Sequence, residues 1–187
     1  YGLNPPYAPT NFNPVGHYKR TFEVPDKWAG KRIRLHFEGV ESAYYVWING
    51  AYVGYSENSF TDHEFDVTDK LRAGENNIAV QVFRWSDGSW LEDQDFIRLS
   101  GIFRDVYLYA TPKVQIQDFQ INASLQDNYV DGDFNTTVWV DNFSGESAEG
   151  YSVELGLYDA AGKEVFAPIM KQLAEIRPSG GEVDASF

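Results

Sequence analysis

Apolar residues recur at every second position through most of this chain, and that period restricts its fold more than any other feature. In residues 31–37, KRIRLHF, the side chains of Ile33, Leu35 and Phe37 alternate with two arginines and a histidine. Successive side chains of a strand point to opposite faces, so this run predicts a strand with one buried face. We expect His36, which falls on the polar face, to be exposed.

A hairpin follows, because Asn49-Gly50 separates two strand-like runs, residues 43–48 and 51–55. This dipeptide favours a type I′ turn, which requires positive φ at both central positions. The hairpin holds five large aromatic residues, and we expect most of them to serve core and cross-strand packing, with a sugar platform on one face as the alternative. These residues are Tyr44, Tyr45, Trp47, Tyr52 and Tyr55.

Further short strands are predicted at fairly even spacing, at residues 64–67, 77–83 and 104–109, with a turn at residues 71–76. Residues 1–15 are rich in proline and asparagine, and we interpret them as an extended arm. No amphipathic helix interrupts the series. This pattern predicts an all-β fold, a β-sandwich or jelly roll.

A second domain is predicted after Thr111-Pro112, which divides the chain into residues 1–112 and 113–187. Three alternating runs follow that dipeptide, and they fit the first strands of an immunoglobulin-like sandwich. Such a domain needs about seven strands over ~100 residues. We therefore expect residues 113–187 to be an incomplete immunoglobulin-like domain. The runs are residues 114–125, 134–141 and 151–158.

The composition excludes several classes of protein. With 43% apolar and 16% aromatic residues, the chain has the means to form a core, which argues against disorder. Its net charge of −13 supplies no basic patch, so we expect no nucleic-acid partner. No apolar run approaches the ~18 residues of a membrane span, and we expect no membrane partner. The first residues lack the features of a signal peptide, so none is expected in this chain, and the compartment stays open between cytoplasm and periplasm.

One segment, residues 84–96 (RWSDGSWLEDQDF), concentrates the candidate chemistry. It holds two tryptophans and four carboxylates, which repel one another unless a cation or hydrogen-bond donors use their oxygens. Three uses remain open: a site for a hard cation, a sugar site in which Trp85 and Trp90 are platforms, and an acid–nucleophile pair of a glycosidase. The alternative is a solvated loop with Arg84, Arg98 and Arg104 as ion-pair partners. The carboxylates are Asp87, Glu92, Asp93 and Asp95.

Residues 84–105, RWSDGSWLEDQDFIRLSGIFRD, resemble the sugar-binding domain of family 2 glycoside hydrolases of the β-galactosidase type. Six further segments match the same family in collinear order. They are residues 4–6, 14–18, 37–43, 47–50, 53–55 and 71–76. Residues 113–187 resemble the immunoglobulin-like domain that follows, mostly by position.

The resemblance implies a jelly-roll sugar-binding domain followed by part of an immunoglobulin-like domain, as a fragment of a retaining β-galactosidase that hydrolyses terminal β-D-galactosides. The catalytic glutamates of the family lie in a TIM barrel to which no part of this chain corresponds. No catalytic residue is therefore carried over, and the fragment alone is expected to be inactive. Enzymes of the family are often oligomeric, so a homo-oligomer is expected for the parent enzyme.

The resemblance also implies roles for three acidic residues. Asp95 occupies the position of a family aspartate that contacts galactose and a Na⁺ ion. Asp87 and Glu57 match positions where related enzymes bind Mg²⁺. Two other functions are compatible with the sequence: a stand-alone carbohydrate-binding module, and a structural β-sandwich that serves interactions between subunits.

Overall fold

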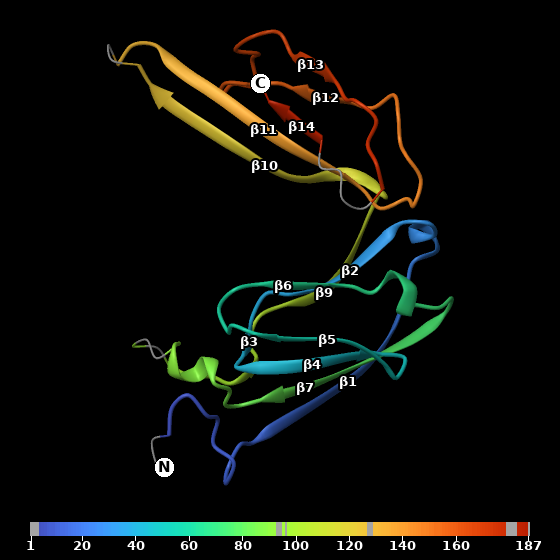
Figure 1. The fold of residues 1–187 in the computed structure, drawn as a ribbon, viewed down its shortest axis with the longest axis vertical. Helices are drawn as coiled ribbons and strands as arrows, with labels where there is room; N and C mark the ends of the chain where they lie inside the picture. The colour runs from blue at the N-terminus through green and yellow to red at the C-terminus, as the bar shows by residue number, and fades with distance from the viewer. Residues whose placement is uncertain (1–3, 93–94, 96, 127–128, 179–182, 187) are drawn as a thin grey trace. The chain divides into compact units, whose positions relative to one another are not determined.

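The computed structural model describes residues 4–92, 95, 97–126, 129–178 and 183–186, and the chain divides into two compact units, residues 1–111 and 112–187. Figure 1 shows the course of the chain through its strands. Every helix among the described residues is a three-residue 3₁₀ helix: η1 (Asp26–Trp28), η2 (Thr68–Lys70) and η3 (Gly88–Trp90). The prediction of an all-β fold is confirmed. No helix in the described part of the chain is long and apolar enough to cross a membrane.

The first unit is built on two antiparallel sheets. One contains four strands in the order β1-β7-β4-β5, and the other contains three in the order β6-β2-β9. A short pair, β3-β8, accompanies them. The larger sheet comprises β1 (Val15–Glu23), β7 (Glu75–Phe83), β4 (Ala43–Ile48) and β5 (Ala51–Glu57). The other strands are β2 (Arg32–Phe37), β3 (Val40–Glu41), β6 (His63–Asp66), β8 (Gly101–Ile102) and β9 (Val106–Thr111).

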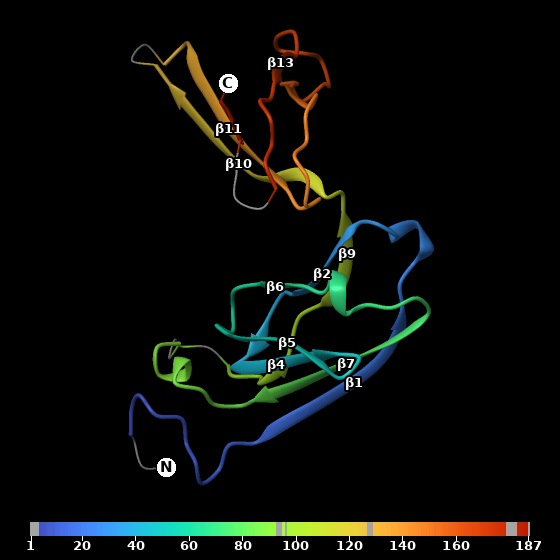
Figure 2. The ribbon, with the colours of Figure 1, turned by 45° about the vertical axis from the view of Figure 1, so that its right-hand side comes forward.

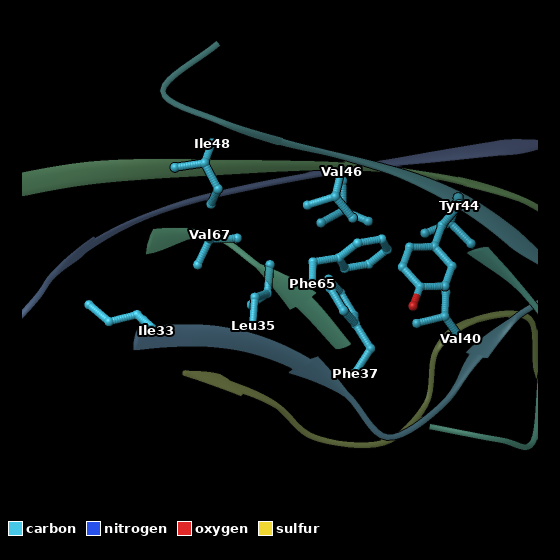
Figure 3. Packing of buried hydrophobic residues seen from close by; sticks show 11 residues of the cluster. Ile33, Leu35, Phe37, Val40, Tyr44, Val46, Ile48, Phe65 and Val67 are labelled. Carbon is cyan, nitrogen blue, oxygen red and sulfur yellow. The ribbon is translucent and has the colours of Figure 1, made fainter. Parts of the chain in front are cut away.

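The core lies between the two sheets, as in a β-sandwich. Ile33, Leu35 and Phe37 extend from β2 toward Val46 and Ile48 of β4 (Figure 3). The period-two prediction therefore identified the buried face of β2. The two central turn residues also have positive φ, 53° at Asn49 and 82° at Gly50, as a type I′ turn requires.

The expectation that His36 is exposed is wrong. Its side chain does leave the core side of β2, but the residue is only 8% exposed. The ring of Tyr107, from the neighbouring strand β9, stacks on it with centroids 4.7 Å apart. A Glu64 carboxylate oxygen lies 2.8 Å from its Nδ1 atom on the other side. Neighbours on both adjacent strands thus bury a residue that its own strand would leave in solvent.

The second unit begins with a long hairpin of β10 (Val114–Leu125) and β11 (Gly132–Asn142), to which β14 (Val183–Ser186) adds a third strand. A separate pair is formed by β12 (Ser152–Leu155) and β13 (Ile169–Gln172). A small core contains Val138, Val140, Val153 and Ile176. Figure 2 gives a second view of these strands. That this unit is an incomplete immunoglobulin-like domain stays a prediction.

Candidate functional site

The acidic segment begins where β7 ends, and the N-terminal arm holds its first residues. The side-chain amide of Asn13 donates to the carbonyl oxygen of Trp85 and accepts from its backbone N–H, both at 2.9 Å. The indole Nε1 of Trp90 donates to the carbonyl oxygen of Tyr7 at 3.2 Å. Both tryptophans of the segment are therefore tied to the arm, through contacts that sequence reasoning did not anticipate.

The carboxylates of the segment have different partners. Asp87 Oδ1 accepts from the backbone N–H of Gly88 at 3.1 Å and caps η3. Glu92 accepts two hydrogen bonds from Ser59, one from the backbone N–H and one from Oγ, each at 2.6 Å. Asp95 is exposed. Asp93 lies outside the described residues. Of the described carboxylates of the segment, Asp87 thus caps a helix, Glu92 is anchored to Ser59 and Asp95 is exposed to solvent.

Glu57, at the end of β5, lies beside the start of this segment. The hydroxyl group of Tyr55 donates to its Oε2 at 2.9 Å. Burial raises the pKa of Glu57, and the negative charges of Asp87 and Glu92 raise it further, against the lowering effect of the Tyr55 hydrogen bond. A carboxylate whose ionised form is disfavoured by its neighbours gains from a nearby cation. The structure therefore brings together Glu57 and Asp87, the two residues predicted as Mg²⁺ ligands. Among the described residues, no group of three or more His, Asp or Glu side chains is arranged to hold a metal ion.

The hairpin aromatics separate onto two faces of the larger sheet. Tyr44 points into the core, and burial raises the pKa of its hydroxyl group to about 12. Tyr45, on the opposite face, is the centre of a ring cluster, with centroid distances of 4.8 Å to Tyr55 and 5.9 Å to Phe83. Trp47 and Tyr52 extend the cluster. Tyr44 therefore meets the expected core packing. The other four rings form an outer aromatic face and meet the expected cross-strand packing, because β4 and β5 pair Tyr45 with Tyr55 and Trp47 with Tyr52.

An open cleft of about 430 Å³ adjoins this aromatic face. Tyr45, Tyr55, Phe83 and Trp85 contribute rings to its lining, and Asp87 contributes a carboxylate. The guanidinium groups of Arg84 and Arg98 lie 5.3 Å and 5.5 Å from the centroid of the Trp85 ring. Aromatic rings beside carboxylate oxygens are chemically suited to a sugar, whose apolar face stacks on rings while its hydroxyl groups donate hydrogen bonds.

Beyond the segment, the chain is held again at Ser100. The backbone N–H of Ser100 donates to Oε2 of the buried Glu41 at 2.7 Å. Ser100 and Gly101 both have positive φ, 60° and 83°, where the chain turns into β8. Arg98 Nη2 donates to the carbonyl oxygen of Ser89 at 3.3 Å. Neither Ser59 nor Glu41 was a sequence candidate, because each anchoring contact joins residues more than thirty positions apart.

Comparison with known proteins identifies the first unit. A family model described as "Glycosyl hydrolases family 2, sugar binding domain" matches residues 2–112. A β-galactosidase of Priestia megaterium is 54% identical over 92% of this chain, and one of Clostridium acetobutylicum is 48% identical over 80%. The chain spans 17% of the length of each of these relatives.

Solved structures share the fold. The β-glucuronidase 2 of Bacteroides uniformis aligns with a TM-score of 0.80 at 23% identity, over 94% of this chain and 21% of that one. A β-glucuronidase of Bifidobacterium dentium aligns with a TM-score of 0.71 at 22% identity, over 92% of this chain and 33% of that one. At such identities the likeness shows a common fold.

Proposed function

Since this chain belongs to glycosyl hydrolase family 2, through the sugar-binding domain of that family, we propose that it is a non-catalytic part of a β-galactosidase. In this proposal the parent enzyme hydrolyses terminal β-D-galactosides. Asp95 contributes a sugar- and Na⁺-binding carboxylate to an active site that other parts of the protein complete. Support comes from the β-galactosidases that resemble 80% or more of this chain.

The observation that carries the role of Asp95 is its exposure next to carboxylates that already have partners. Asp87 caps a helix and Glu92 is anchored to Ser59, whereas Asp95 is exposed to solvent between two anchored residues, Glu92 and Ser100. A carboxylate accepts hydrogen bonds from sugar hydroxyl groups and ligates a hard cation with the same oxygens. An exposed aspartate on an anchored segment is well suited to reach a ligand held by another part of the protein.

Glu57 and Asp87 are the proposed Mg²⁺ ligands. Their carboxylates fit the ion, because Mg²⁺ prefers oxygen ligands and is usually bound through one or two carboxylates together with water. The raised pKa of Glu57 supports this assignment, since a cation would relieve the repulsion that contributes to it. When bound, the ion would neutralise negative charge at the start of the segment that carries Asp95.

The experiment is the substitution Asp95→Asn in the full-length protein, which preserves size and removes the negative charge. We expect kcat/KM for a β-galactoside to fall by about 10²-fold, which corresponds to ~3 kcal/mol of transition-state stabilisation, and the Na⁺ dependence of the rate to weaken. Asp26→Asn, at an exposed aspartate of η1, is the control and should leave both unchanged. Unchanged kinetics of Asp95→Asn at every Na⁺ concentration would make Asp95 an ordinary surface residue.

The aromatic cleft favours a second candidate function, a stand-alone carbohydrate-binding module. Its rings come from the sheet, from Trp85 and from Tyr7 of the N-terminal arm, whereas the Trp90 indole donates a hydrogen bond to the carbonyl oxygen of Tyr7. In that case the isolated chain should be retarded in a galactan-containing gel, and Tyr55→Ala should abolish the retardation. Equal mobility with and without galactan would reject this candidate.

A further inference from the structure

Glu92 and Ser59 form a two-point anchor between distant parts of the first unit. Ser59 lies between β5 and β6 and is 0% exposed, while Glu92 comes directly after the turn that follows η3. Both carboxylate oxygens of Glu92 are engaged, one by the Ser59 N–H and the other by its Oγ, each at 2.6 Å. Hydrogen bonds to an ionised acceptor are shorter and stronger than neutral ones, so this anchor fixes the position of Glu92 firmly.

The anchor fixes the start of the segment that runs from Glu92 to Ser100, because Glu92 is the first residue of that segment. That segment is anchored again at its other end. Glu41 accepts from the backbone N–H of Ser100 at 2.7 Å. Asp95 is exposed between these two fixed points, three residues after Glu92. A group that must meet a ligand needs to be held within a fraction of an ångström of its working position, and residues behind it commonly supply that rigidity.

We infer that Ser59 and Glu92 are positioning residues, which hold the segment of Asp95 so that its carboxylate meets sugar and Na⁺ in the right place. The inference rests on the function proposed above. Ser59 and Glu92 act only through Asp95, and their removal should therefore weaken binding of Na⁺ and substrate without abolishing the reaction.

The test is a double-mutant cycle in the full-length protein. Glu92→Ala should raise KM and the Na⁺ concentration for half-maximal rate by about 10-fold, the lower end of the effects seen for residues behind a metal ligand. Ser59→Ala should raise both by a smaller factor, because the backbone N–H of residue 59 still donates to Glu92 when the hydroxyl group is lost. Glu92→Gln should stay within about 3-fold of wild type, because its amide can accept from the Ser59 N–H and donate to Oγ. Added to Asp95→Asn, Ser59→Ala should have no further effect, since the group that it positions is already lost.

Thr68→Ala is the control for loss of a bonded hydroxyl group, because Thr68 Oγ1 also makes two short contacts, to Ile33 N at 2.8 Å and to Asp66 Oδ1 at 2.6 Å. It should leave the kinetics unchanged. Because Thr68 is exposed and Ser59 is 0% exposed, it should lower the melting temperature less than Ser59→Ala does. The positioning role is overturned if the kinetics of Ser59→Ala are as unchanged as those of Thr68→Ala. It is also overturned if the fold-change in KM of the double variant equals the product of the fold-changes of Ser59→Ala and Asp95→Asn. If Asp95→Asn alone leaves KM and the Na⁺ dependence of the rate unchanged, the proposed function is wrong, and the positioning role is wrong with it.

Discussion

At the scale of single residues, Glu64 of β6 contacts three side chains from the other two strands of the sheet β6-β2-β9. Its oxygens accept from Arg34 Nη1 at 2.7 Å and from the Tyr109 hydroxyl group at 2.6 Å, and His36 Nδ1 lies 2.8 Å away. Burial alone would raise the pKa of Glu64, but the hydrogen bonds from Tyr109, His36 and Arg34 outweigh it and hold the pKa below its usual value. The ionised carboxylate therefore stabilises the folded state.

Replacing Glu64 with Gln should lower the free energy of unfolding by about 2 kcal/mol at pH 7, because charge-assisted hydrogen bonds are lost. A lowered folded-state pKa means that this contribution is complete above the usual glutamate pKa of ~4.3 and disappears as pH falls through the folded value. Urea unfolding at pH 7 and pH 3 measures the difference. The exposed Glu23→Gln is the control, and a deficit in Glu64→Gln that was as large at pH 3 as at pH 7 would contradict the electrostatic explanation.

At the scale of elements, β5 meets the opposite sheet at a position where it carries no side chain. A Cβ atom on Gly54 would lie 2.4 Å from Cε1 and 2.7 Å from Cδ1 of Phe65. That ring is packed edge-on against Phe37 and Tyr44, with centroids 6.1 Å and 6.2 Å away, and these contacts limit its movement away from Gly54. Glycine at position 54 thus permits the close approach of the two sheets.

We expect Gly54→Ala to destabilise the first unit by roughly 1–3 kcal/mol, the usual cost of overfilling a packed core. Gly132→Ala is the control: its Cβ would meet the nearest atom at an ordinary 3.5 Å, so its effect should stay within about 0.5 kcal/mol. Adding Phe65→Leu to Gly54→Ala should make the two substitutions less than additive, because both act on the same contact. Strict additivity in thermal unfolding would place the cause elsewhere.

At the scale of the whole molecule, the chain combines a sugar-binding domain with a second, separately packed unit. Retaining hydrolysis requires an acid and a nucleophile whose carboxyl groups are ~5 Å apart on either side of the glycosidic bond. In the first unit, Asp87 and Glu92 are held as a cap and as an anchor, and the proposed role of Asp95 is binding.

The 187-residue chain by itself should therefore show no turnover of a chromogenic β-galactoside. A preparation of the full-length protein assayed in parallel is the positive control. Activity that co-purified with the short chain and disappeared on Asp95→Asn would contradict the non-catalytic role of this part.

Much of the fold could be predicted from the sequence because its signals are local. The period-two pattern of residues 31–37 identified the buried face of β2, and Asn49-Gly50 identified a turn whose backbone has positive φ. The segment of residues 84–105 also pointed to the family that the comparison later showed. Each of these signals consists of consecutive residues, so it can be recognised from the sequence without the structure.

Only the tertiary structure assigned different roles to residues that look alike in the sequence. The acidic run contains three carboxylates that the sequence alone does not distinguish: Asp87, Glu92 and Asp95. Their contacts differ, because Ser59, thirty-three positions from Glu92, hydrogen-bonds to Glu92, whereas Asp87 caps η3. His36 is buried through Tyr107 and Glu64, which belong to other strands. Strand formation depends on neighbours along the chain, whereas burial and anchoring depend on neighbours in space, and those are decided when the sheets pack together.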